Sequence, residues 1–173
     1  MIIQMGHHDF GENRVQEAKL KWQDFLKNNS DIRLHFIGKL QSNKIKGIGE
    51  FFQFIHSLDS IKNAELLAKE EIRSSKKLQY FIQVNIAKEI QKSGIQEEDL
   101  NELITFCRKV DLNVIGLMCI PPVTGNSSVL FKRLQQLSAN YSLKELSMGM
   151  SNDYKDAISN GATYVRIGSS IFS

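Results

Sequence analysis

An arginine lies inside a segment that otherwise has the pattern of a buried strand. In TYVRIG, residues 163 to 168, Val165 and Ile167 flank Arg166, and Gly168 is followed by two serines. The guanidinium of arginine stays protonated, and burying it without a partner is strongly unfavourable. Arg166 therefore requires an acceptor, and a ligand could supply it.

Two segments near the end of the chain are rich in glycine and hydroxyl side chains. They are SMGMSND, residues 147 to 153, and GSS, residues 168 to 170. Exposed backbone N–H groups, hydroxyls and a helix N-terminus all donate toward an anion, so such loops are typical of phosphate sites. The alternative is structural: Ser151 caps a helix over residues 153 to 160, and Gly168 and Ser169 cap whatever follows them.

The period of two along a strand puts Tyr164, Arg166 and Gly168 on one face. The arginine and the glycine of the phosphate loop then look into the same space, where a guanidinium would reach the far end of a small phosphorylated ring. The alternative is an ion pair between Arg166 and a strand-end carboxylate, either Glu12 or Asp59.

Short apolar runs alternate with segments of helical period along the whole chain, which predicts parallel strands joined by crossover helices. Helical stripes follow residue 15, Ser60 as a likely N-cap type, residue 97 and the two prolines at 121 and 122. Seven strands are expected, at residues 8–12, 34–38, 52–58, 78–86, 112–120, 143–148 and 163–168.

Seven such units predict an α/β fold of the (β/α)₈ TIM-barrel type with one strand missing, since these barrels usually have ~250 residues and at least about 200. The missing strand should be the first, because residues 1 to 6 have the pattern of a helix tail closed by Gly6. We expect a single domain over residues 1–173, incomplete at its N-terminus. An open α/β sheet is the alternative, and in both folds ligands bind at the carboxyl ends of the strands.

The composition argues against several classes of protein. The 173 residues carry a net charge of +3 that is spread along the chain, which does not favour nucleic-acid binding. No apolar run reaches the ~20 residues of a membrane span. The two cysteines lack the spacing of a zinc site, the four histidines form no HExxH motif, and neither a metal nor export is expected. The cytoplasm is the expected compartment.

Seven motifs together carry a resemblance to a known family. They are HHDFGENRVQEA, LHFIGKLQSNKIK, IHSLDS, QVNIAKEIQKSG, GLMCIPP, LSMGMSNDYKDAI and GATYVRIGSSIF. In this order they resemble the pyridoxal phosphate homeostasis protein family, whose members are single-domain barrels similar to the N-terminal domain of alanine racemase. The resemblance covers residues 1 to 172.

The resemblance implies a site for pyridoxal phosphate (PLP). Arg166 matches the arginine that faces the pyridine nitrogen; because it only donates, it should keep that nitrogen unprotonated. Asn13 matches a position that lines the pocket, and Asn43 and Lys44 match a nearby motif without an assigned role, or begin a helix capped by Ser42. The matched phosphate-binding positions and their neighbour are Met150, Ser151, Gly168 and Ser169.

One departure from the family pattern is large. The family attaches PLP covalently through a lysine at the end of its first strand, and no residue here matches that lysine; Lys39 is more simply placed in solvent. The resemblance therefore implies an N-terminally truncated chain, either a fragment or a decaying copy, in which PLP binding is noncovalent and weakened.

The expected function is that of a non-catalytic PLP-binding protein in intracellular PLP homeostasis, which stores, delivers or buffers the cofactor. PLP-dependent apo-enzymes are possible recipients, and the chain should be a monomer or a weak homodimer. The alternatives are a PLP-dependent amino-acid racemase, which needs two bases of which the lysine is absent, an inactive remnant, and an unrelated phosphate-handling barrel enzyme that would use Glu12 and Asp59.

Overall fold

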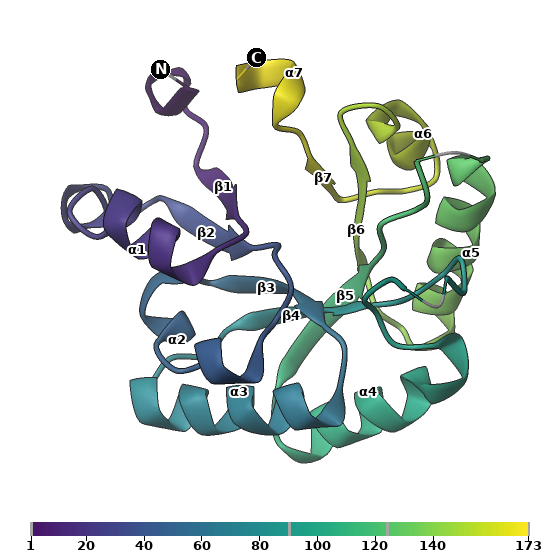
Figure 1. Cartoon of the computed structure of the whole chain (residues 1–173), viewed down its shortest axis with the longest axis horizontal. Coiled ribbons are helices and arrows are strands. Elements are labelled where there is room, and N and C mark those ends of the chain that lie inside the picture. The colour runs from purple at the N-terminus through teal and green to yellow at the C-terminus, as the bar shows by residue number, and fades with distance from the viewer. Residues whose placement is uncertain (1, 90, 124, 173) are drawn as a thin grey trace.

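Seven parallel strands form one continuous curved sheet in the computed structural model, which describes residues 2–89, 91–123 and 125–172 (Figure 1). Neighbours in the sheet are neighbours in the chain, in the order β1 to β7, and every pairing is parallel. The strands are β1 (Asp9–Glu12), β2 (Arg33–Phe36), β3 (Phe54–Leu58), β4 (Gln79–Gln83), β5 (Asn113–Met118), β6 (Glu145–Met150) and β7 (Tyr164–Arg166). The seven predicted strands and the barrel-type fold are confirmed.

Helices connect successive strands along the outer side of the sheet (Figure 1). The strongest local signal is at Ser60, whose hydroxyl accepts the Asn63 N–H and begins the helix that follows, as the sequence predicts. The helices are α1 (Val15–Trp22), α2 (Ile48–Phe51), α3 (Ile61–Ser74), α4 (Leu100–Lys109), α5 (Ser127–Asn140), α6 (Tyr154–Ser159) and α7 (Ser169–Phe172), with 3-10 turns at Ile2–Met5, Leu26–Asn28, Ser42–Lys44 and Glu97–Asp99.

Apolar side chains are buried on both faces of the sheet, as expected for parallel strands covered by crossover helices. The large core lies between the sheet and the helices and includes Leu34, Tyr80 and Phe131. A second, small core lies on the concave side, where Phe54, Phe81 and Met118 are buried. This inner layer fills the amino-terminal part of the barrel and leaves its carboxyl-terminal end for polar groups.

The sheet does not close, because β1 and β7 each pair with only one neighbour among the described residues. Both edge strands are short, with four and three residues, so few unpaired backbone groups are presented. The turn at Ile2–Met5 ends at Gly6, which has φ +84° as expected for a helix-ending glycine. Met1, part of the predicted helix tail, lies outside the described residues.

Candidate functional site

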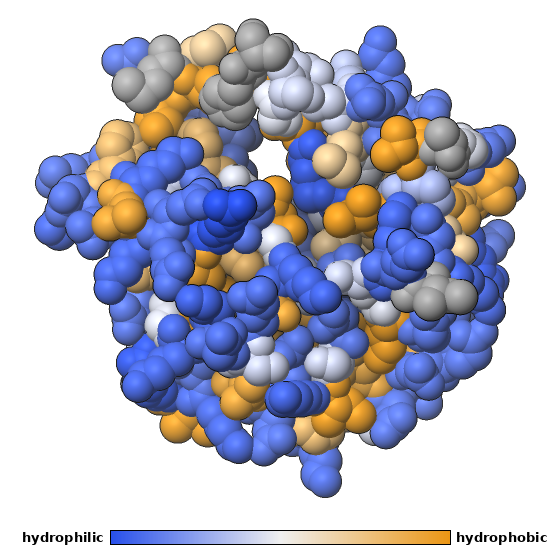
Figure 2. Space-filling view, in the orientation of Figure 1, coloured by the Kyte–Doolittle hydropathy of each residue, from blue (hydrophilic) through white to orange (hydrophobic). Residues whose placement is uncertain are grey.

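A cavity of about 530 Å³ opens at the carboxyl ends of the strands, between the β1–β2 and β6–β7 sides of the sheet. In the space-filling view the molecule is hollowed on this side (Figure 2). The volume is in the range of small-molecule sites. All six residues predicted from the sequence lie among those lining it, which are Asp9, Gly11, Asn13, His35, Ile37, His56, Ile120, Met150, Ser151, Tyr164, Val165, Arg166, Ile167, Gly168 and Ser169.

The loop after β6 is held against α6 by Gly149. This glycine has φ +91°, and a Cβ atom built on it would lie 2.5 Å from the Cβ of Ala157, so no other residue fits without strain. The Met150 N–H donates to Asp153 Oδ1 at 2.6 Å, which fixes the following turn. Asp153, not Ser151, occupies the N-cap position of α6, and the capping role considered for Ser151 is therefore wrong.

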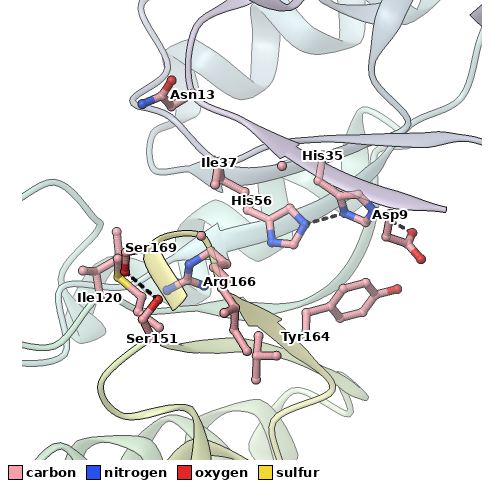
Figure 3. Close-up of a pocket in the computed structure, with 15 residues that line it drawn as sticks. Asp9, Asn13, His35, Ile37, His56, Ile120, Ser151, Tyr164, Arg166 and Ser169 are labelled. Carbon is pink, nitrogen blue, oxygen red and sulfur yellow. Dashed lines mark hydrogen bonds and ion pairs between the residues drawn. The ribbon is translucent and has the colours of Figure 1, made fainter. Parts of the chain in front are cut away.

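The two hydroxyl-rich loops meet in this cavity. Ser169 Oγ donates to Ser151 Oγ at 3.0 Å, although the residues lie eighteen positions apart in the chain (Figure 3). Gly168, between Arg166 and Ser169, has no other group within 4 Å of the position that a Cβ would take. Two adjacent hydroxyls and an open glycine can together surround a small anion.

Arg166 lines the cavity and is held by neutral acceptors. Its Nη1 donates to Ser147 Oγ at 2.7 Å and its Nη2 donates to the carbonyl oxygen of Cys119 at 2.8 Å. No carboxylate in the described chain forms an ion pair with it. Burial lowers the pKa of its guanidinium, because the charged form is desolvated.

The predicted alternative, an ion pair from Arg166 to Glu12 or Asp59, is wrong. Glu12 accepts hydrogen bonds from Lys21 and Trp22, and Asp59 accepts one from Asn63. Neither carboxylate lines the cavity, so they cannot serve the aldolase-type or isomerase-type alternative there either.

Three further polar side chains form a row along one wall of the cavity (Figure 3). Asp9 Oδ1 lies 2.9 Å from His35 Nε2, and His35 Nδ1 lies 3.0 Å from His56 Nε2. Each imidazole stacks on a phenylalanine, His35 on Phe54 and His56 on Phe81. Burial lowers the pKa of both rings, that of His56 to about 2, so both are neutral at physiological pH.

Asn13 approaches the cavity from the loop after β1. Its backbone packs so closely on Gly38 that a Cβ on Gly38 would lie 2.0 Å from the Asn13 carbonyl oxygen. Lys39 and Lys44 are exposed and line a separate cavity of about 300 Å³ on the far side of Asn13. Ser42 is the first residue of the 3-10 turn at Ser42–Lys44 and donates to Asn63, so it does not cap a helix.

Sequence reasoning missed Asp9, Ser147 and Cys119, and it treated His35 and His56 only as core histidines. The two histidines are indeed buried and hydrogen-bonded, and both also line the cavity. A usable signal was present, because histidine recurs inside two neighbouring apolar strands, and facing positions of neighbouring strands can bond to each other.

Two other properties limit the chemistry of the described residues. They contain no group of three or more histidine, cysteine, aspartate or glutamate side chains that could hold a metal ion. Every helix in the described ranges is too short or too polar to cross a membrane.

Comparison with known proteins gave consistent matches. The family model for the alanine racemase N-terminal domain matches residues 1–173. The pyridoxal phosphate homeostasis protein of Pseudomonas aeruginosa is 40% identical over 96% of this chain and 74% of its own length, and that of Escherichia coli is 36% identical over 98% and 77%. The chain thus spans about three quarters of these relatives. Among solved structures, PipY from Synechococcus elongatus with PLP bound superposes with a TM-score of 0.90 at 34% identity, covering 99% of this chain and 84% of that chain.

Proposed function

This chain belongs to the pyridoxal phosphate homeostasis protein family, and on that premise we propose that the cavity at Arg166 binds PLP without covalent attachment and without turnover. The protein then acts in PLP homeostasis as a store, carrier or buffer of the cofactor. One observation carries the assignment: a guanidinium with unspent donors lies in the same cavity as the Ser151–Ser169 hydroxyl pair.

The residues present fit the two polar ends of PLP. A guanidinium has five N–H groups, and Ser147 and Cys119 take two of those of Arg166, so donors remain for a ring nitrogen. Ser151, Gly168 and Ser169 would hold the phosphate, while Asn13 and Met150 would border the ring. Bound PLP supplies an electrophilic aldehyde and an electron-withdrawing ring.

The character of Arg166 favours storage over catalysis. Because arginine donates and does not release a proton, it keeps the ring nitrogen it faces unprotonated, and an unprotonated ring withdraws electrons less strongly. The cavity-lining residues that the structure describes include no lysine. Noncovalent binding follows from that absence around the cavity, and it is a statement about this site only.

A racemase function is not favoured by the geometry. Racemisation requires a base on each face of the reacting carbon. Tyr164 is the one tyrosine among the described residues lining the cavity, and burial raises the pKa of its hydroxyl, which keeps it protonated. We expect no interconversion of D- and L-alanine in the presence of added PLP.

Titration with PLP, followed by absorbance and by protein fluorescence, tests the binding. We expect saturable binding by the chain, and roughly tenfold to hundredfold weaker binding by Arg166→Met, because a hydrogen bond to a charged group contributes about 1.5–3 kcal/mol. Arg108→Met, at an exposed arginine outside the cavity, is the matched control and should bind as the unmodified chain does. Absence of saturable binding by the folded chain would refute the proposal.

Borohydride treatment of the loaded protein tests the noncovalent mode. Mass spectrometry should then detect no PLP attached to a lysine, and a stoichiometric adduct would overturn this part of the proposal. We further propose PLP-dependent apo-enzymes as recipients, the cytoplasm as the compartment, in keeping with the two buried free thiols, and a monomer or weak homodimer, which analytical ultracentrifugation would test.

A further inference from the structure

Arg166 is one end of a continuous row of hydrogen-bonded side chains that crosses four strands. Arg166 bonds to Ser147 Oγ at 2.7 Å, and Ser147 Oγ lies 2.7 Å from His56 Nδ1. The row continues from His56 Nε2 to His35 Nδ1 at 3.0 Å, and from His35 Nε2 to Asp9 Oδ1 at 2.9 Å. Its three middle members are buried, with 0 to 5% of their surface exposed.

The two ends of the row determine the direction of every hydrogen bond in it. Asp9 is held as a carboxylate: burial raises its pKa, but hydrogen bonds from Arg33 and His35 outweigh that effect and leave the pKa below its ordinary value. A carboxylate only accepts, and the guanidinium at the other end only donates. Between them each neutral imidazole can donate through one nitrogen and accept through the other.

Starting from the acid, the donor roles can be assigned one after another. His35 must donate from Nε2 to Asp9, so its Nδ1 accepts from His56 Nε2. His56 Nδ1 is then an acceptor, and Ser147 donates its hydroxyl proton to it. The lone pairs of Ser147 Oγ remain free to accept from Arg166. The reverse direction would place a bare ring nitrogen against the carboxylate, where two acceptors would repel each other.

Charging either ring would break this order. A protonated histidine donates from both nitrogens, so His35 could no longer accept from His56. The surroundings oppose protonation of His56, since Arg166 faces it from β7 and His35 from β2. Around His35 the charged or titratable groups are Asp9, Arg33 and His7, and Tyr164 stacks near both rings.

We propose that Asp9, His35, His56 and Ser147 are positioning residues, which form a one-directional hydrogen-bond chain that fixes the guanidinium of Arg166 for acceptor ligands. Ser147 takes one N–H from Arg166 and the Cys119 carbonyl takes another, so the plane of the guanidinium is defined by two strands. Arg166 then offers only donors to the cavity, and the site selects a ligand ring whose nitrogen carries a lone pair. The inference rests on the proposed function for the ligand, but the hydrogen-bond order is a property of the protein alone.

Nitrogen-15 NMR of histidine in the cofactor-free protein tests the order directly. We expect the His35 and His56 rings both to be neutral and protonated at Nε2, and to remain so as the pH is lowered from about 7.5 to 5.5. Single His7→Asn and His8→Asn variants assign the other two histidines while leaving the row intact. A ring protonated at Nδ1, or at both nitrogens, would refute the proposed order.

A matched pair of serine variants tests the effect on the ligand. Ser147→Ala removes the bond to Arg166, and PLP binding should weaken about tenfold. Ser57→Ala is the control, because Ser57 is also a buried strand serine but its hydroxyl has no partner within the described residues. Binding by this control should change less than twofold, and equal affinities of the two variants would overturn the inference.

Asp9 gives a second pair in case Ser147→Ala does not fold, because its side chain is partly exposed at the end of the row. Asp9→Asn keeps an acceptor for His35 Nε2 and should retain the Nε2–H form of both rings, whereas Asp9→Ala should lose it in His35. If both Asp9 variants leave the tautomers unchanged, the carboxylate does not set the order and the inference fails. If the unmodified chain shows the expected tautomers but binds no PLP, the proposed function fails and the hydrogen-bond order stands.

Discussion

Two glycines of the candidate site should respond in opposite ways to the same substitution. Gly149 and Gly168 both lie in the loops that the phosphate would occupy, but their surroundings differ. In Gly149→Ala, the methyl group meets Ala157 Cβ at 2.5 Å and Tyr154 Cα at 3.0 Å, in a backbone with φ +91°. In Gly168→Ala, the methyl group meets nothing within 4 Å.

The expected loss of stability for Gly149→Ala has two parts. The left-handed backbone costs about 1–2 kcal/mol for a residue with a Cβ, and overpacking against α6 costs about 1–3 kcal/mol. Their sum of about 2–5 kcal/mol corresponds to a decrease in Tm of roughly 4–20 °C for a chain of this size. For Gly168→Ala the free energy of unfolding should stay the same or rise by up to about 1 kcal/mol, because its φ is not in the left-handed region.

Ligand binding should show the opposite pattern. The added methyl group of Gly168→Ala occupies space in the cavity, and PLP should bind roughly fivefold to hundredfold more weakly, because overpacking costs about 1–3 kcal/mol. Pyridoxal, which lacks the phosphate, should be affected much less. Thermal unfolding by circular dichroism and titration with both ligands give the four measurements. If Gly149→Ala melts as the unmodified chain does, or Gly168→Ala weakens both ligands equally, the geometric reasoning is refuted.

Two other predictions concern the hydroxyl pair and the buried histidines. Ser151→Ala and Ser169→Ala should each weaken PLP binding roughly twofold to tenfold, since a hydrogen bond contributes about 0.5–1.5 kcal/mol, and should leave pyridoxal binding unchanged; calorimetric titration with both ligands checks this, and equal losses would place the phosphate elsewhere. Stability should fall on acidification, because His56 has a pKa of about 2 when folded and 6.5 as a model value, so the unfolded chain takes up the proton first. Between about pH 7.5 and pH 5 this single group should remove about 2 kcal/mol of the free energy of unfolding. Urea unfolding at both pH values, with His56→Gln as the comparison, tests the sign, and a pH-independent stability would contradict it.

The strand order and the place of the site could be predicted from the sequence because both depend on local patterns. Apolar runs of strand length, separated by segments of helical period, leave parallel pairing as the simple solution, and parallel strands bring their carboxyl ends to one edge. The MGMS and IGSS segments both follow strands, so their meeting at Ser151 and Ser169 follows from chain order alone.

The partners of Arg166 could not be predicted in this way. Ser147 and Cys119 lie 19 and 47 residues before it and carry no signal of their own, while the more conspicuous acids Glu12 and Asp59 are engaged elsewhere. Which acceptor a buried cation finds depends on the curvature of the sheet and on the register of β5, β6 and β7, and a sequence pattern specifies neither.

The sequence by itself therefore determined which residues would stand at the carboxyl ends of the strands, because side-chain alternation and strand polarity are properties of the backbone. Only the tertiary structure decided that Asp9, His35, His56 and Ser147 form one hydrogen-bonded row ending at Arg166. These residues lie on β1, β2, β3, β6 and β7, and side chains on strands so far apart in the sheet meet only because the sheet curves until its inner faces oppose each other.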